Sequence, residues 1–273
     1  MLKDVSDAVN NHASGTLILP LVAAQDYIFL GADAPFNHRW IELGAVNDQA
    51  SAITVAIWDG NAWIDCAEMI DLTKDSAGTK TLAASNRLIW VPDPFKTGWG
   101  RDDTKTSSGR EITGLGAARI FNLFWARLKF SGDIKATTEL KYLGWKFAND
   151  EDLYALYPEF DTSSARERFK TGTTTFDQMH FEAAKSLLRD LKAAQVITSE
   201  NQVIEWEVMR LPAIHKAAEL IYAALGSDWA DERKLAIESY KRAMQVDLFN
   251  VDQDANARLD VRESSFRQGR MLR

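Results

Sequence analysis

The sequence predicts an α+β protein with two domains, an antiparallel β-sandwich over residues 1–149 and an α-helical bundle over residues 150–263. Apolar residues of the first part alternate with polar ones, as in strands, whereas those of the second part recur every three or four residues, as in helices. Seven of the nine tryptophans precede residue 146. A chain of 273 residues is also long enough for each part to bury its own core.

Short apolar runs in the first part predict about eight to ten strands, a number typical of a β-sandwich. The clearest runs cover residues 16–21, 27–30, 39–43, 53–58, 63–66, 88–91, 124–130 and 139–147. Asp59-Gly60 lies between two of these runs and predicts a hairpin turn. Residues 4–14 are polar and predict an arm or a short helix. Residues 92–116 are rich in glycine and polar side chains, so we expect a long loop of the kind that is usually functional or flexible.

Four helices are expected in the second part of the chain. They cover approximately residues 150–156, 176–191, 212–225 and 231–248. Thr175 is the expected cap of the second helix, and Pro212 suits the first turn of the third because proline is tolerated there. Gly226 ends the third helix, and Asp228 or Asp231 opens the fourth.

Composition and charge exclude several classes of protein. The net charge of -7 and a pI near 5.2 argue against nucleic acid as the main partner, because neutralising phosphates needs a clustered basic face. We find no apolar run of 18 residues and no secretory signal, so neither a membrane anchor nor secretion is expected. The single cysteine, Cys66, cannot form an intrachain disulfide, which favours synthesis in a reducing cytoplasm. It is expected as a small buried apolar residue rather than a nucleophile.

The tryptophans of the first part are open to two interpretations. They are Trp40, Trp58, Trp63, Trp90, Trp99, Trp125 and Trp145. Aromatic rings can stack on the apolar faces of sugars, but most of these residues lie within strand patterns. Core packing, with each indole N–H hydrogen-bonded, is therefore the favoured interpretation. Trp99 lies in the predicted loop and is the candidate for a surface aromatic residue.

No set of residues indicates catalysis. The histidines are His12, His38, His180 and His215, and none has the spacing of a zinc site. Nucleophile elbows, phosphate-binding loops and dinucleotide fingerprints are absent from the sequence. We therefore predict that the protein is not an enzyme.

One acidic segment matches the spacing of an EF-hand calcium loop. Its oxygen ligands would be Asp252, Asp254, Asn256, Asp260 and Glu263. Ala257 departs from the pattern, because the sixth position needs a positive φ that costs alanine about 1–2 kcal/mol. The alternatives are a bound calcium ion and a solvated acidic turn, and no other cofactor is predicted.

Residues 264–273 form a C-terminal arm with both apolar and basic residues. The candidate contacts are Phe266, Arg267, Arg270, Met271, Leu272 and Arg273. Such an arm can dock on another subunit, where arginine pairs with carboxylates. The alternative is a frayed chain end.

Residues 151–254 resemble the helical head-completion proteins of tailed bacteriophages, the adaptor or connector subunits beneath the portal. The matching features are Asp152-Leu153, Tyr157-Pro158-Glu159-Phe160, Phe176-Asp177, Ala183-Ala184, Leu187-Leu188, Leu191, Ala217-Ala218, Ile221-Tyr222-Ala223-Ala224-Leu225, Tyr240, Asp247-Leu248, Asp252 and Asp254. The first part is similar to sandwich domains of phage virion proteins. Its matching features are Ile57-Trp58-Asp59-Gly60, Trp63, Asp71-Leu72-Thr73, Leu88-Ile89-Trp90 and Phe124-Trp125-Ala126-Arg127-Leu128.

The resemblance implies a structural protein of the virion neck, made in the host cytoplasm. Copies would form a closed, dodecameric ring that contacts the portal protein and other neck or tail-completion proteins. DNA would pass through the lumen without specific binding, and no membrane is involved. The alternative function is a carbohydrate-binding module, or an attachment module for fibres or decoration, in a virion assembly.

Overall fold

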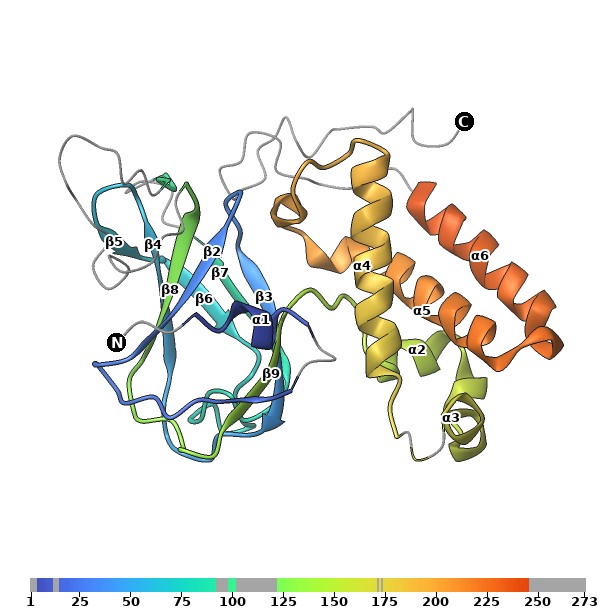
Figure 1. Ribbon diagram of the computed structural model, residues 1–273, viewed down its shortest axis with the longest axis horizontal. Coiled ribbons are helices and arrows are strands. Elements are labelled where there is room, and N and C mark those ends of the chain that lie inside the picture. The colour runs from blue at the N-terminus through green and yellow to red at the C-terminus, as the bar shows by residue number, and fades with distance from the viewer. Residues whose placement is uncertain are drawn as a thin grey trace. The chain divides into compact units, whose positions relative to one another are not determined.

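Two antiparallel sheets and a group of helices occupy successive parts of the chain (Figure 1). The computed structural model describes residues 4–11, 15–91, 98–101, 122–170, 172 and 174–245. These residues contain nine strands and six α-helices, so the predicted α+β class is confirmed. The contacts divide them into two compact units, which we call the strand unit, residues 4–144, and the helical unit, residues 145–245.

Every strand ladder in the strand unit is antiparallel. The five-stranded sheet has the order β1-β9-β3-β7-β6, and the four-stranded sheet has the order β2-β8-β4-β5. The strands are β1 (Leu17–Ile18), β2 (Tyr27–Ala32), β3 (His38–Ala45), β4 (Ile53–Trp58), β5 (Trp63–Asp65), β6 (Glu68–Asp71), β7 (Asn86–Val91), β8 (Phe124–Phe130) and β9 (Glu139–Gly144). The short helix α1 (Ser6–Val9) precedes them, in agreement with one of the two forms expected there.

Both sheets contribute side chains to one hydrophobic core. Alternate residues of β4 and β8 enter it, because successive side chains of a strand point to opposite faces. Leu88 and Trp90 of β7 join from the five-stranded sheet, and both are fully buried. The predicted hairpin at Asp59-Gly60 is confirmed, since β4 and β5 pair with Trp58 opposite Trp63.

The helical unit is built around α5, which is buried on most of its circumference. Its helices are α2 (Asp150–Leu156), α3 (Ser163–Phe169), α4 (Asp177–Ala193), α5 (Arg210–Leu225) and α6 (Ala230–Gln245). Short 3-10 turns lie between them at η1 (Pro158–Phe160), η2 (Glu200–Gln202), η3 (Trp206–Met209) and η4 (Ser227–Trp229). Figure 1 shows α4, α5 and α6 side by side, and α5 packs against both neighbours. Gly226 ends α5 with a φ of 99°, as its position predicts.

The segment after β9 belongs to the helical core. Trp145 and Phe147 are buried among residues of α4 and α5, although their alternation predicted a strand through residue 147. Inside the helical unit the capping of α4 also differs from the prediction. Its N-cap is Phe176 and not Thr175, and the main-chain N–H of Phe176 donates to the Asp150 carboxylate at 3.1 Å.

Candidate binding surface

A second aromatic cluster of the strand unit lies apart from the main core. Trp58 and Trp125 are buried in it, and Phe29, Trp63 and Leu123 are half-buried against them. Their strand positions alternate with those of the core residues, so these side chains lie on the opposite face of the four-stranded sheet. We define the aromatic face as Tyr27, Phe29, Trp58, Trp63, Trp125 and Arg127.

The strand register brings these rings together. Trp58 and Trp63 are opposite one another in the β4-β5 hairpin, with ring centroids 5.6 Å apart and planes at 64°. Phe29 lies 5.7 Å from Trp63. Gly31 pairs with Trp125 across β2 and β8, and a Cβ at Gly31 would lie 2.8 Å from the indole ring. The missing side chain therefore makes room for the ring of Trp125.

Arg127 is the only charged member of the aromatic face as defined here. Its guanidinium carbon lies 4.9 Å from the ring centroid of Tyr27 and 4.7 Å from that of Trp63, so both rings contact the cation. Burial lowers the pKa of Arg127 from its ordinary value, while the nearby Tyr27 and Asp65 raise it. Arginine stays charged under these conditions.

Three hydrogen-bond donors of the aromatic face are buried without an acceptor among the described residues. They are the Nε1 atoms of Trp63 and Trp125 and the Nε atom of Arg127. A buried donor that lacks a partner costs about 1–3 kcal/mol. The aromatic face thus combines a cation held between two rings with donors that are shielded from solvent.

The predicted core role of the tryptophans is confirmed for five of the seven. Trp40, Trp58, Trp90, Trp125 and Trp145 are each less than one-tenth exposed. The expectation that each indole N–H is hydrogen-bonded is only partly right. Trp40 donates to Glu42 at 2.8 Å, whereas the Nε1 atoms of Trp63, Trp90, Trp99 and Trp125 have no acceptor among the described residues.

Trp99, the candidate surface aromatic residue, is half-buried. It packs 5.1 Å from Phe36 and 6.3 Å from Phe124, because the short stretch 98–101 lies against the strands. Gly100 fixes this stretch by donating its N–H to the Trp58 carbonyl at 2.9 Å. Trp99 therefore contributes to packing.

The three described histidines have separate local partners. His38 Nδ1 lies 2.7 Å from the Asn37 side chain, and burial holds the pKa of His38 well below its ordinary value. His180 Nε2 lies 2.9 Å from the Asp150 carboxylate, and His215 Nδ1 lies 2.8 Å from the Tyr157 hydroxyl. No group of three metal-ligating side chains occurs in the part of the chain that the structure describes.

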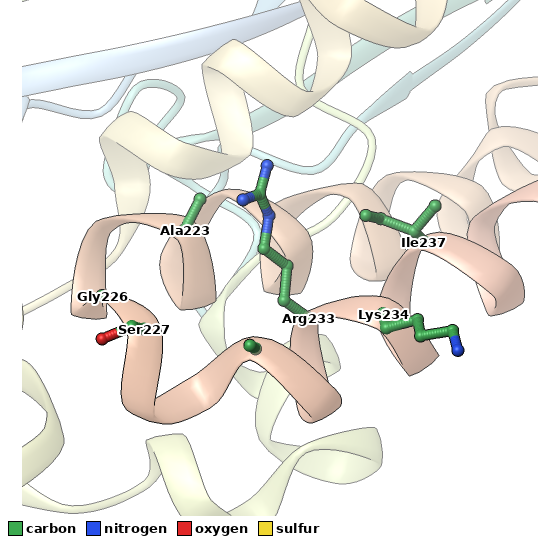
Figure 2. Close-up of a pocket in the computed structure, with 7 residues that line it drawn as sticks. Ala223, Gly226, Ser227, Arg233, Lys234 and Ile237 are labelled. Atoms are coloured by element: carbon green, nitrogen blue, oxygen red, sulfur yellow. The ribbon is translucent and has the colours of Figure 1, made fainter.

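A hollow of about 490 Å³ opens on the helical unit at the turn between α5 and α6 (Figure 2). It is lined by Ala223, Gly226, Ser227, Ala230, Arg233, Lys234 and Ile237. The hollow forms where three of these residues have little or no side chain. Figure 2 shows Arg233 and Lys234 projecting from α6 in different directions, so the hollow is bordered by two cations.

Several expected sites lie outside the described residues. These are the calcium-like positions Asp252, Asp254, Asn256, Asp260 and Glu263, the arm residues Phe266, Arg267, Arg270, Met271, Leu272 and Arg273, His12, and most of the loop 92–116. Cys66 is described and half-buried, and burial raises the pKa of its thiol to about 12. This agrees with the expected packing role.

Arg127 was missed in the sequence, although its position carries a signal. Along β8, Trp125, Arg127 and Lys129 alternate with residues of the core. Period two therefore predicts that these three share the opposite face. Their contacts with Tyr27 and Trp63 depend on strand pairing, which the sequence does not state.

Comparison with protein-family models, curated proteins and solved structures finds no match for this chain. Among the residues described, no helix combines the length and the apolar character needed to span a membrane. The fold and the surface thus define an α+β protein with a candidate binding face on its strand unit.

Proposed function

We propose that this chain is a structural virion protein of a tailed-phage neck, an adaptor or connector subunit that forms a ring beneath the portal and links capsid to tail. One observation carries the proposal: the residues that resemble phage adaptors are also those that build the core of the helical unit. Leu153, Phe160, Phe176, Leu187, Leu188, Leu191, Ala218, Ile221, Tyr222 and Tyr240 all belong to that core. The residues that carry the resemblance therefore belong to one unit with its own hydrophobic core.

The proposal includes the finer architecture and the remaining partners. The strand unit is a β-sandwich domain and the helical unit a second domain, followed by the arm of residues 264–273. Phe266, Arg267, Arg270, Met271, Leu272 and Arg273 dock on the portal or the adjacent subunit. Partners are further copies in a closed ring, the portal and other neck proteins, and DNA passes without specific binding. The protein acts as part of the virion and not as an enzyme.

The hollow on the helical unit offers one surface for ring contacts. A closed ring joins two different patches of neighbouring subunits, so each subunit presents one patch to each neighbour. The hollow suits an apolar side chain flanked by carboxylates, because small residues form its floor and Arg233 and Lys234 border it. Leu235, the residue after Lys234 on α6, is 63% exposed and adds apolar surface to this helix.

Particle mass and electron microscopy test the ring. We expect the full-length chain, alone or with portal protein, to give ring-shaped particles of one defined mass. Ala223→Trp fills the hollow and should reduce the ring population at least about tenfold, since a misfitted interface readily loses more than 1.4 kcal/mol. Ala224→Trp is the matched control, because Ala224 is an exposed neighbour outside the hollow.

Two results would refute the ring. A chain that stays monomeric at all concentrations and does not bind portal protein excludes an adaptor. Rings that form equally with both tryptophan variants exclude the hollow as the contact, while leaving the adaptor role standing.

The second candidate function is a carbohydrate-binding module, or an attachment module for fibres or decoration. The aromatic face favours the attachment form, since Trp, Tyr and Arg often dominate binding energy between proteins. A glycan array tests the carbohydrate form, with Trp63→Ala as the variant because Trp63 is half-buried on this face. Loss of a glycan signal in the variant would support it, and silence of the wild type would contradict it.

A further inference from the structure

We infer that the aromatic face of the four-stranded sheet docks a carboxylate-bearing polypeptide segment of another protein, and that Arg127 receives the carboxylate. The inference deepens the proposed attachment role and rests on it. It is independent of ring formation, which is assigned to the helical unit.

The unused hydrogen-bonding groups of the aromatic face are all donors. The Nε1 atoms of Trp63 and Trp125 and the Nε of Arg127 are buried and lack acceptors among the described residues. Tryptophan and arginine side chains have no acceptor atoms. The two terminal Nη atoms of Arg127 are not among these buried atoms, so they are the donors that a ligand oxygen, such as that of a carboxylate, can reach.

Two rings hold the Arg127 side chain in place before a carboxylate binds. The rings of Tyr27 and Trp63 lie within 4.9 Å of its guanidinium carbon, so few conformations remain to be lost when a ligand binds. Its ring contacts are with Tyr27 and Trp63; burial lowers its pKa, and the charges of Tyr27 and Asp65 offset part of that shift. A carboxylate can pair with guanidinium through two parallel hydrogen bonds. Lys129 lies exposed on the same face of β8 and adds positive charge.

The ring geometry favours a polypeptide over a sugar. Neighbouring rings are inclined by 46° between Phe29 and Trp63 and by 64° between Trp58 and Trp63, so they form no flat platform. Trp58 and Trp125 are each only 5% exposed, which leaves little open ring surface for stacking. Trp, Tyr and Arg are the residues that most often dominate binding energy between proteins.

Binding to a synthetic peptide array tests the inference with the full chain. The array carries short peptides in which Asp or Glu stands beside Leu, Phe or Pro, each next to its Asn or Gln counterpart. We expect acidic peptides to bind at least about tenfold more tightly than their amide counterparts, because a desolvated charge pair is lost in the latter. On binding, the indole N–H resonances of Trp63 and Trp125 should shift in nuclear magnetic resonance spectra.

Two variants locate the carboxylate. Arg127→Gln should reduce affinity for the acidic peptides at least about tenfold and remove their preference over the amides. Lys129→Gln is the matched control, since it removes a charge from the same face of the same strand but at an exposed position that is screened. It should change affinity less than about threefold.

Three outcomes would overturn the inference. They are equal binding of acidic and amide peptides, binding by Arg127→Gln at the wild-type level, and recognition only of glycans, probed with oligogalacturonate, without any acidic peptide. The first comparison uses wild-type protein, so it remains decisive if Arg127→Gln fails to fold. Particle mass separates this result from the adaptor role, because Arg127→Gln should still form rings.

Discussion

Asp150 holds the start of the helical unit to α4, and replacing it should destabilise that unit. Its carboxylate accepts the main-chain N–H of Phe176 at 3.1 Å and lies 2.9 Å from His180 Nε2. Phe176 is fully buried and the His180 side chain is 0% exposed, so water cannot easily replace the lost acceptor. Two buried groups without partners cost about 1–3 kcal/mol each, so Asp150→Ala should lower the free energy of unfolding by about 2–6 kcal/mol.

Urea unfolding followed by far-UV circular dichroism measures this loss, because α2 to α6 all lie in the helical unit. Asp150→Asn keeps one acceptor oxygen and should lose less, about 1–2 kcal/mol. The control is Asp161→Ala, since this carboxylate is 64% exposed and its one ion pair among the described residues is with Arg166 at 3.6 Å. If Asp150→Ala and Asp161→Ala differ by less than about 0.5 kcal/mol, the assigned role of Asp150 is wrong.

Three further predictions concern titratable groups. Because the pKa of Cys66 rises from 9.0 to about 12, the native thiol should react with a disulfide reagent at least about tenfold more slowly than in urea, and equal rates would contradict its burial. Burial raises the pKa of Asp177, but Lys146 at 2.6 Å, together with Thr175 and His180, lowers it overall; the stability that these contacts contribute above pH 4 is therefore lost as pH falls through the lowered pKa. Asp177→Asn should flatten that acid loss in urea titrations, and an unchanged slope would count against the pair. Burial lowers the pKa of His215, so the unfolded chain takes up a proton at this residue at a higher pH than the native protein does. The native state should therefore lose stability as pH falls from 6.5 through the lowered pKa, and a magnetic resonance titration midpoint above 6.5 in the native protein would contradict the lowered pKa.

Segments with a clear apolar periodicity were predicted at the right place, and elements without buried residues were missed. The strands at residues 53–58 and 124–130 match β4 and β8 at both ends, because their apolar residues enter one core at period two. β6 was missed since it lies at the edge of its sheet and none of its residues is buried. α3 was missed for a related reason, because it has no buried residue and therefore no apolar stripe.

The other features that the sequence did not predict depend on contacts between residues far apart in the chain. Thr175 was the expected cap of α4, but the group that receives the Phe176 N–H is Asp150, 26 residues earlier. The sequence likewise identified the tryptophans as core residues without indicating which sheet face each occupies. Arg127 became a candidate only when pairing of β2, β8, β4 and β5 placed it between Tyr27 and Trp63.

The last strand residue and the first residue of the helical core are neighbours in the chain. β9 ends at Gly144, and the next residue, Trp145, is already buried among the helices. A helical fragment that begins at residue 150 would lack Trp145 and Phe147 of its core and Lys146, the ion-pair partner of Asp177. The helical unit expressed alone must therefore begin at residue 145.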